Sequence, residues 1–310
     1  MHATLPRREP WRIQFDRIAQ FKAAILTFAF LWFFLPTITG LVAKWIKDPD
    51  WSHGAIIPFF SIFLVSQKWD KIKRCPPTGA WLGLPIVLIS MAFYIFNYTQ
   101  TGRMLGAFYP YTMLLCLLGV IILTCGVPIL RYVWLPWAYL LFAIPLPKGV
   151  YYALTDPLRR IGAIVAAAVL PVVPYLQVDR IGPQLEYDYL GNTGTIGLHD
   201  ACSGMRSTIT LCALGVAIAY ITDRPWWHRF ILIAACIPIA TFCNLIRVLT
   251  TCLLHIFVDP KYAEGTYHTM LGLAVLLLAF GIFSALGWLL NNLFVDAESD
   301  EKASQAEAAG

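Results

Sequence analysis

Residues 230–257 have the sequence FILIAACIPIATFCNLIRVLTTCLLHIF, an apolar run interrupted by one charged side chain, Arg247. A helix needs about 20 predominantly apolar residues to cross the hydrocarbon core of a bilayer, and a longer run is accommodated by tilting. The 310-residue chain shows the same bias, with 58% hydrophobic and 13% charged residues. Soluble domains carry about 25% charged residues. The sequence therefore predicts an integral membrane protein.

Several further apolar runs resemble this one in length. None of them shows the regular two-residue alternation of a membrane barrel strand, so helices are the expected spanning elements. We expect an all-α polytopic membrane protein with about eight transmembrane helices, at 23–43, 53–69, 80–98, 107–126, 133–147, 203–221, 230–257 and 268–292.

The polar ends of the chain predict its orientation. Residues 1–22 carry five basic side chains, and positive segments beside a span stay in the cytoplasm. This segment is too polar for the apolar region of a signal peptide, so the first span is expected to be an uncleaved targeting element. Residues 23–292 form one predicted membrane domain. Residues 293–310 are predicted to be a disordered acidic tail, which eight crossings return to the cytoplasm.

Residues 149–173 form an ambiguous segment between the fifth and sixth predicted spans. Arg159 and Arg160 precede its apolar part, and Pro171 and Pro174 end it. A full crossing here would put everything downstream on the opposite side of the membrane. We expect an outer-face or re-entrant helix instead.

The next segment, residues 175–200, is polar and is predicted to lie outside the membrane. Its fragments Gln177–Ile181 and Gln184–Tyr187 alternate between apolar and polar side chains. Such alternation is typical of strands. A small β-hairpin is therefore predicted just before the sixth span.

A cysteine with charged neighbours opens the sixth span, where residues 198–207 have the sequence LHDACSGMRS. Asp200 is placed to cap the helix, which makes Cys202 its second residue. The positive end of the helix dipole lowers the pKa of a thiol there, and Arg206, four residues on, shares the same face. The sequence also fits a structural cysteine, or a disulfide between Cys202 and Cys252.

The segment Asn244-Leu-Ile-Arg247 lies inside the seventh predicted span. A charged residue within a membrane helix is costly and marks a functional site by default. Arg247 lies about 25 Å along the helix from Phe230, close to the outer leaflet, with Asn244 one turn below. The alternative is a snorkelling arginine or a buried ion pair.

Four histidines fall on the predicted outer side of the membrane: His53, His199, His255 and His268. His268 lies where the eighth span re-enters from outside. Together with Cys202 and Arg247, it brings an imidazole, a thiol and a guanidinium from three helices to one membrane depth. A nucleophile, a base and a fixed cation for an oxyanion are the groups that cysteine-based acyl transfer requires.

Other classes of site lack support in the sequence. The basic residues bunch in short loops without the aromatic-interleaved basic face of a nucleic-acid binder. The eight cysteines include no CxxC pair and no HExxH motif occurs, which argues against a disulfide scaffold and a metal site. No nucleotide-binding glycine motif has the required context, so no cofactor is expected.

The chain resembles the exosortase/archaeosortase family of membrane sorting enzymes over roughly residues 45–290. Each matching piece is weak alone, but they occur in the order of the family. They are WSHGAIIP at 51–58, IPLP at 144–147, ACSGMRS at 201–207, NLIR at 244–247, and His268 followed by Gly272.

The resemblance implies a cysteine peptidase with transpeptidase activity and a thioester acyl-enzyme. Its substrates are exported proteins with a C-terminal sorting signal, made of a short motif (Pro-Glu-Pro in many bacterial substrates), a transmembrane helix and a basic tail. The catalytic residues of the family fall on Cys202, Arg247 and His268, with histidine in third place as in bacterial exosortases. The supporting or substrate-binding residues are expected to be His53, Asp200, Arg206 and Asn244.

The same resemblance implies a multi-pass protein of a bacterial plasma membrane, acting at the extracytoplasmic face. Membrane lipid surrounds the bundle, and the membrane helix of the substrate lies against it. The acyl group passes to water or to an acceptor, for which surface polysaccharide and lipid are both open.

Two other functions remain open from the sequence. The first is a transporter or channel in which Arg247 lines an outward-facing anion path; it predicts polar residues through the full depth of several helices. The second is a membrane acyltransferase that acts on lipid or polysaccharide with the same nucleophile.

Overall fold

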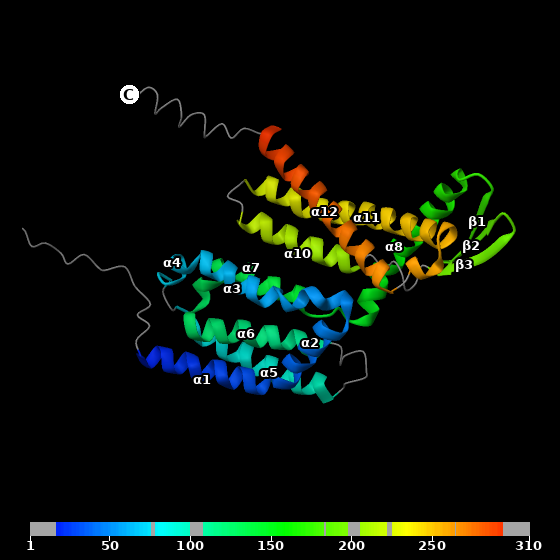
Figure 1. Cartoon of the computed structure of the whole chain (residues 1–310). Coiled ribbons are helices and arrows are strands. Elements are labelled where there is room, and N and C mark those ends of the chain that lie inside the picture. Colours follow the sequence, from blue (N-terminus) through cyan, green and yellow to red (C-terminus); the bar gives the residue numbers. More distant parts are fainter. Residues whose placement is uncertain are drawn as a thin grey trace, which may run out of the picture. The chain divides into compact units, whose positions relative to one another are not determined.

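The structure is a computed structural model that describes residues 17–75, 78–99, 108–182, 184–197, 205–221, 225–263 and 265–293 (Figure 1). The chain divides into two compact units, Met1–Val150 and Tyr151–Gly310. Each unit has its own core, and each is described by itself below.

The first unit is entirely helical in its described part. Its elements, in chain order, are α1 (Arg17–Phe33), α2 (Leu35–Lys47), η1 (Pro49–Ala55), α3 (Ile57–Gln67), α4 (Trp69–Ile72), η2 (Ala80–Leu82), α5 (Gly83–Thr99), α6 (Tyr109–Cys125), η4 (Val127–Ile129), α7 (Leu130–Tyr139) and η5 (Leu140–Ala143).

A bend of 66° separates α1 from α2 at Phe34. Pro36 lies in the first turn of α2, where its missing N–H costs nothing but its ring prevents α1 from continuing. Phe34 is 1% exposed and packs edge-on against Tyr94 of α5. The hydroxyls of Thr37 and Tyr94 are 2.8 Å apart and share a hydrogen bond, which joins α2 to α5.

Helices α5 and α6 pack backbone against backbone through two glycines. A Cβ on Gly83 would lie 2.5 Å from the carbonyl oxygen of Gly119 and would also meet the backbone of Leu123. Small residues allow this close approach of membrane helices, where van der Waals packing drives association. The α5–α6 pair is therefore a fixed element of the first unit.

We expect Gly83→Ala to lower the free energy of unfolding by about 1–3 kcal/mol, because the added methyl group meets backbone that cannot move aside. Thermal unfolding in detergent measures the effect. Gly40→Ala in α2 is the matched control, since nothing lies within 4 Å of the added Cβ there. Equal stability of the two variants would contradict the close packing of α5 and α6.

The second unit combines long helices with a small sheet. Its elements are α8 (Lys148–Val169), η6 (Leu170–Val172), β1 (Leu176–Ile181), β2 (Gln184–Tyr189), β3 (Asn192–Gly197), α10 (Met205–Ile221), α11 (Trp226–Phe257), η7 (Pro260–Ala263) and α12 (Gly265–Leu293).

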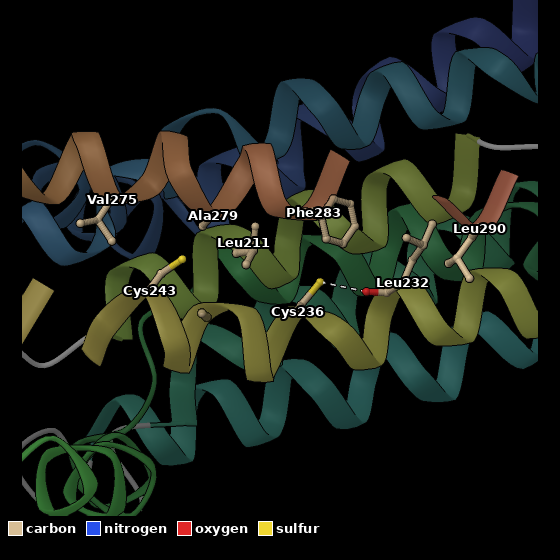
Figure 2. Packing of buried hydrophobic residues seen from close by; sticks show 9 residues of the cluster. Leu211, Leu232, Cys236, Cys243, Val275, Ala279, Phe283 and Leu290 are labelled. Carbon is tan, nitrogen blue, oxygen red and sulfur yellow. Dashed lines mark hydrogen bonds between the residues drawn. The ribbon is translucent and has the colours of Figure 1, made fainter. Parts of the chain in front are cut away.

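Helices α10, α11 and α12 enclose an apolar core (Figure 2). Leu211 of α10 and Cys236 of α11 are fully buried, and Phe283 of α12 is 1% exposed. Gly215 of α10 lies directly against the Cys236 sulfur, so a side chain at this glycine would collide with it. Helix α11 packs against both α10 and α12, and α12 crosses the α10–α11 pair at an angle (Figure 1).

The mostly helical, polytopic fold is confirmed, but the described helices support fewer crossings than the eight predicted. Three are long and apolar enough to cross a membrane alone, at 80–99, 226–257 and 270–293. Two bent pairs, broken at Phe34 and at Gly126, raise the number to five if each pair is one span.

The physical reason is that prolines and caps shorten the apolar helices. The run predicted at 53–69 has only Ile57–Gln67 as α3, because residues 49–55 form a 3-10 helix whose first turn is capped by the Asp48 carboxylate. Helix α8 is not among the candidate spans, and its placement at the outer face stays a prediction.

The predicted hairpin is present and carries a third strand. Strands β1, β2 and β3 form an antiparallel meander with Asp179 opposite Glu186 and Glu186 opposite Thr195. The third strand was not predicted because its sequence, NTGTIG, contains a single large apolar residue. That residue, Ile196, is 5% exposed and packs in one cluster with Leu185 of β2.

The sheet is attached to the C-terminal end of α11 (Figure 1). Tyr187 meets His255 edge-on with ring centroids 6.0 Å apart, and Tyr189 meets Phe257 at 4.8 Å. The buried face of the sheet continues into a core formed by α8 and α11, which includes Ala163, Ala166, Val248 and Cys252.

Candidate active site

The predicted nucleophile and its cap lie outside the described residues, since Asp200 and Cys202 fall within 198–204. The backbone of Arg206 is described in the first turn of α10, and that of His268 in the first turn of α12. Arg247, Asn244 and His53 are described in full. Arg247 is therefore the predicted catalytic residue whose side chain and surroundings the structure describes.

A row of polar residues lies along one face of α11. Asn244, Arg247, Thr251 and His255 follow one another at three- or four-residue spacing, which keeps them on one side of a helix. We call these four residues the α11 polar row. Asn244, Arg247 and Thr251 are at most 9% exposed. Burying such groups inside an otherwise apolar helix is costly, so the row indicates a function.

The guanidinium of Arg247 lies against α12. A Cβ built on Gly272 would be 3.7 Å from Cζ of Arg247 and 3.9 Å from Nη2. Glycine at this position therefore leaves room for the planar cation beside the α12 backbone. His268 precedes Gly272 by one helical turn and shares its face of α12. The structure thus brings Arg247 beside the first turns of α12, where the predicted base lies in the sequence.

Two members of the α11 polar row have unused hydrogen-bonding capacity within the described part of the chain. Neither Oδ1 of Asn244 nor Oγ1 of Thr251 has a hydrogen-bond partner there, and both atoms are buried. A buried polar atom without a partner costs about 1–3 kcal/mol. These atoms flank Arg247 on the two neighbouring turns, where a bound peptide or a water molecule would satisfy them.

Sequence reasoning missed Thr251. A single threonine in a membrane helix carries no charge and gives no signal on its own. Its spacing of four residues from Arg247 was the available clue, because residues at this distance meet on a helix face. Its side chain is 1% exposed, which distinguishes it from Thr250, whose hydroxyl donates to the carbonyl of Ile246.

The connection between α11 and α12 is fixed by a capping carboxylate. Asp259 accepts a hydrogen bond of 3.0 Å from the backbone N–H of Lys261 and lies 3.3 Å from its Nζ. The backbone N–H, with a further contribution from the ammonium group, lowers the pKa of Asp259 below its usual value. The short η7 that follows holds the ends of the two helices together.

His53 lies in the first unit, within η1, with its ring 6.0 Å from that of Trp51. Gly54, in the same WSHG motif, lies directly against the indole of Trp45. That indole donates a hydrogen bond of 2.8 Å to the carbonyl of Ala143, next to Ile144. Trp45 therefore joins the WSHG and IPLP motifs, which are far apart in the sequence.

The face of the sheet away from the core is polar and hollowed. A cavity of about 520 Å³ is lined by Gln177, Asp179, Glu186, Tyr187, Asp188, Thr193, Gly194 and Thr195. Within the described ranges, no group of three or more histidine, cysteine or acidic residues is arranged to hold a metal ion.

The positions of buried residues on α11 bear on two alternatives, a channel and a structural disulfide. In the described part of the second unit, the deeply buried residues on the first half of α11 beyond His228 are apolar, while Asn244, Arg247 and Thr251 gather in the second half. A channel through this unit would need polar residues over the whole depth. Cys252, the predicted partner in a disulfide, is fully buried in the core beneath the sheet.

The chain was compared with protein families, curated proteins and solved structures. The model of a family described as transmembrane exosortase matches residues 45–285, which is more than half of the chain. No curated protein and no solved structure matched. The matched range includes every predicted site residue, from His53 to His268.

Proposed function

Because the chain belongs to the transmembrane exosortase family, we propose that it cleaves C-terminal sorting signals through a thioester on Cys202. Members of this family are cysteine transpeptidases that process sorting signals at the membrane. The chain is accordingly a multi-pass membrane enzyme, and its substrates are exported proteins that carry such a signal.

The observation that carries the proposal is the position of Arg247. Its guanidinium is buried on α11 and lies against Gly272 of α12. Oxygen atoms of Asn244 and Thr251 that have no hydrogen-bond partner among the described residues flank it. A fixed cation in a largely dry site stabilises a developing oxyanion far better than the same cation in water. The predicted base, His268, precedes Gly272 by one turn.

In the proposed first step, His268 takes the proton of the Cys202 thiol and the thiolate attacks the peptide carbonyl carbon. The C–S bond forms, and the carbonyl electrons move onto oxygen, where Arg247 donates hydrogen bonds to the oxyanion. Collapse of this intermediate breaks the C–N bond. His268 returns the proton to the leaving amine, and a thioester remains on Cys202.

In the second step, a nucleophile attacks the thioester and releases the thiolate. Water yields a free carboxylate, whereas an amine or hydroxyl of a surface polysaccharide or lipid yields an amide or ester. We place this chemistry at the extracytoplasmic face of a bacterial plasma membrane. Confinement of the membrane helix of the substrate beside the enzyme raises its effective concentration.

The remaining predicted residues support this site. Asp200 accepts hydrogen bonds from the backbone N–H groups beside Cys202, while Arg206, four residues after Cys202, adds positive charge that favours the thiolate. Asn244 accepts a hydrogen bond from the bound peptide through Oδ1. The role of His53, as a supporting or substrate-binding residue, stays a prediction from the sequence.

The proposed thioester can be trapped. We expect the detergent-purified enzyme, mixed with a reporter that carries a Pro-Glu-Pro motif, a membrane helix and a basic tail, to give an acid-stable adduct within a turnover. Mass spectrometry should locate the adduct on Cys202. Neutral hydroxylamine should release it as a hydroxamate, because thioesters react readily with this amine and oxygen esters resist it.

The Cys252→Ala variant serves as the control and should give the same adduct as the unmodified enzyme. Cleavage of the reporter without any adduct, or with an adduct on another residue, would rule out the proposed intermediate.

A further inference from the structure

Strand β3 has one free edge. The two-residue turn Leu190-Gly191, with positive φ at both positions, makes Tyr189 and Asn192 a hydrogen-bonded pair. Pairing alternates along an antiparallel ladder, so Gly194 also bonds to β2. The backbone N–H and C=O of the intervening residues, Thr193, Thr195 and Gly197, then face away from β2. Among the described residues, β3 makes no backbone hydrogen bond outside this ladder.

The free edge of β3 lacks the features that normally protect an edge strand. Natural edges carry charged residues, prolines, bulges or covering segments. The sequence NTGTIG has no charge and no proline, and the pairing is regular throughout.

The opposite edge of the sheet is different. Strand β1 presents the charged Arg180 there, and its first residue, Leu176, already donates its N–H to the carbonyl of Val173. Of the two edges, that of β3 has the unprotected backbone N–H and C=O groups that can pair with another strand.

We propose that β3 binds the extended segment of the exported substrate as a fourth strand of the sheet. This proposal rests on the proposed function. Gly197 precedes Cys202 by five residues, which span at most about 17 Å when fully extended. A peptide held on β3 is therefore within reach of the nucleophile.

The chemistry of the edge defines what it recognises. Added strands are held by main-chain hydrogen bonds, so this edge accepts many sequences. The nearest side chains are the uncharged Thr193 and Thr195. The carboxylate of Glu186 is on the next strand, about 10 Å from the added one at about 4.8 Å per strand, which exceeds the Debye length of about 8 Å at physiological salt.

The alternation also sets a rule for proline. Every second residue of the added strand turns its N–H toward β3, and proline cannot occupy these positions because it has no N–H. Proline fits the positions between them. A Pro-x-Pro spacing satisfies this rule, because both prolines face outward and the residue between them makes the hydrogen bonds.

One proline on each edge tests the proposal with a matched pair. Thr195→Pro removes an outward N–H from β3 without removing a bond to β2, and Arg180→Pro removes an outward N–H from β1. We expect Thr195→Pro to lower the rate of reporter cleavage at least about 10-fold, through the loss of one main-chain hydrogen bond and the clash of the ring with the added strand. Arg180→Pro should stay within about 2-fold of the unmodified enzyme. Cleavage by Thr195→Pro at the unmodified rate would overturn the proposal.

Cross-linking gives a second test that does not depend on catalysis. Thr195→Cys is introduced together with Cys202→Ala, and single cysteines are placed along the reporter segment that precedes its membrane helix. Side chains of directly opposed residues lie close enough for a disulfide. We expect a strong cross-link at the one reporter position opposite residue 195 and weaker ones two residues to either side, with none at the positions between, because alternate residues share a face of the sheet.

Cross-links at every position, at none, or only between two copies of the enzyme would overturn strand addition. The experiments test the nucleophile and the strand addition independently of each other. If Cys202→Ala cleaves normally, the nucleophile is wrong but the cross-linking pattern still reports the bound strand. If the pattern is absent while Cys202→Ala is inactive, only the docking mode is wrong.

Discussion

Replacement of Cys202 by alanine is expected to lower reporter cleavage by at least about 10,000-fold, because loss of a catalytic nucleophile removes the covalent route and leaves only binding and electrostatic effects. The variant should still insert into the membrane, since the substitution removes one sulfur atom near a helix terminus. Cleavage is measured on membranes by the mobility of the reporter, and insertion by protease protection of the loops.

Cys252→Ala is the matched control for this prediction and also separates two explanations. If Cys202 acts as a nucleophile, the control keeps its activity, because Cys252 lies in the apolar core beneath the sheet and takes no part in the proposed chemistry. If the two cysteines instead form a structural disulfide, both variants lose the same stability and the same activity. Normal cleavage by Cys202→Ala would exclude the mechanism altogether.

Replacement of Arg247 by glutamine is the second change with a large expected effect. We expect cleavage to fall by about 100- to 1,000-fold, the usual consequence of removing one oxyanion donor. The variant should stay folded, because glutamine keeps a long polar side chain at this position and is a good helix former. Arg247→Lys should retain part of the activity, since an ammonium supplies charge but lacks the planar fork of donors.

Thermal unfolding of these variants distinguishes a catalytic arginine from a structural one. Arg159→Gln in α8 is the control, because Arg159 is a partly buried arginine that lies 3.5 Å from the Asp156 carboxylate. It should lose little cleavage activity. A large loss of stability in Arg247→Gln, with cleavage per folded molecule unchanged, would mean that Arg247 serves only the packing of α11.

The helix that was predicted best from the sequence is the longest apolar one, which continues through Pro238 without a break. The run at 230–257 is helical throughout, as predicted, and α11 ends at Phe257 but begins four residues earlier than predicted, at Trp226. In other predicted spans, a single residue broke the helix that the sequence predicted. Pro36 turns one predicted span into a bent pair, and the Asp48 cap replaces the start of another by a 3-10 helix. Run length and mean hydropathy do not reveal such breaks.

The sheet and the site show a different limit. Strand β3 is held by its partner, because Tyr187 of β2 lies over Gly194 and Leu185 shelters Ile196, and neither contact leaves a pattern in the β3 sequence. Arg247 and Asn244 were found because charge and amide groups are rare in a membrane helix. Thr251 needed the structure, since its importance comes only from burial beside Arg247.

The α11 polar row has a consequence for the precision of the enzyme. The helix contacts the sheet at its last turns and carries the guanidinium about two turns earlier, and the backbone between them is continuous α-helix without proline or glycine. The number of residues between them sets the angle, around the helix axis, between the Arg247 side chain and the side chains that contact the sheet. Each residue added or removed between Arg247 and His255 would rotate one against the other by about 100°. The length of this helical segment therefore determines how the Arg247 guanidinium is oriented relative to the sheet. Substitutions that keep the number of residues between Arg247 and His255 should leave this orientation unchanged.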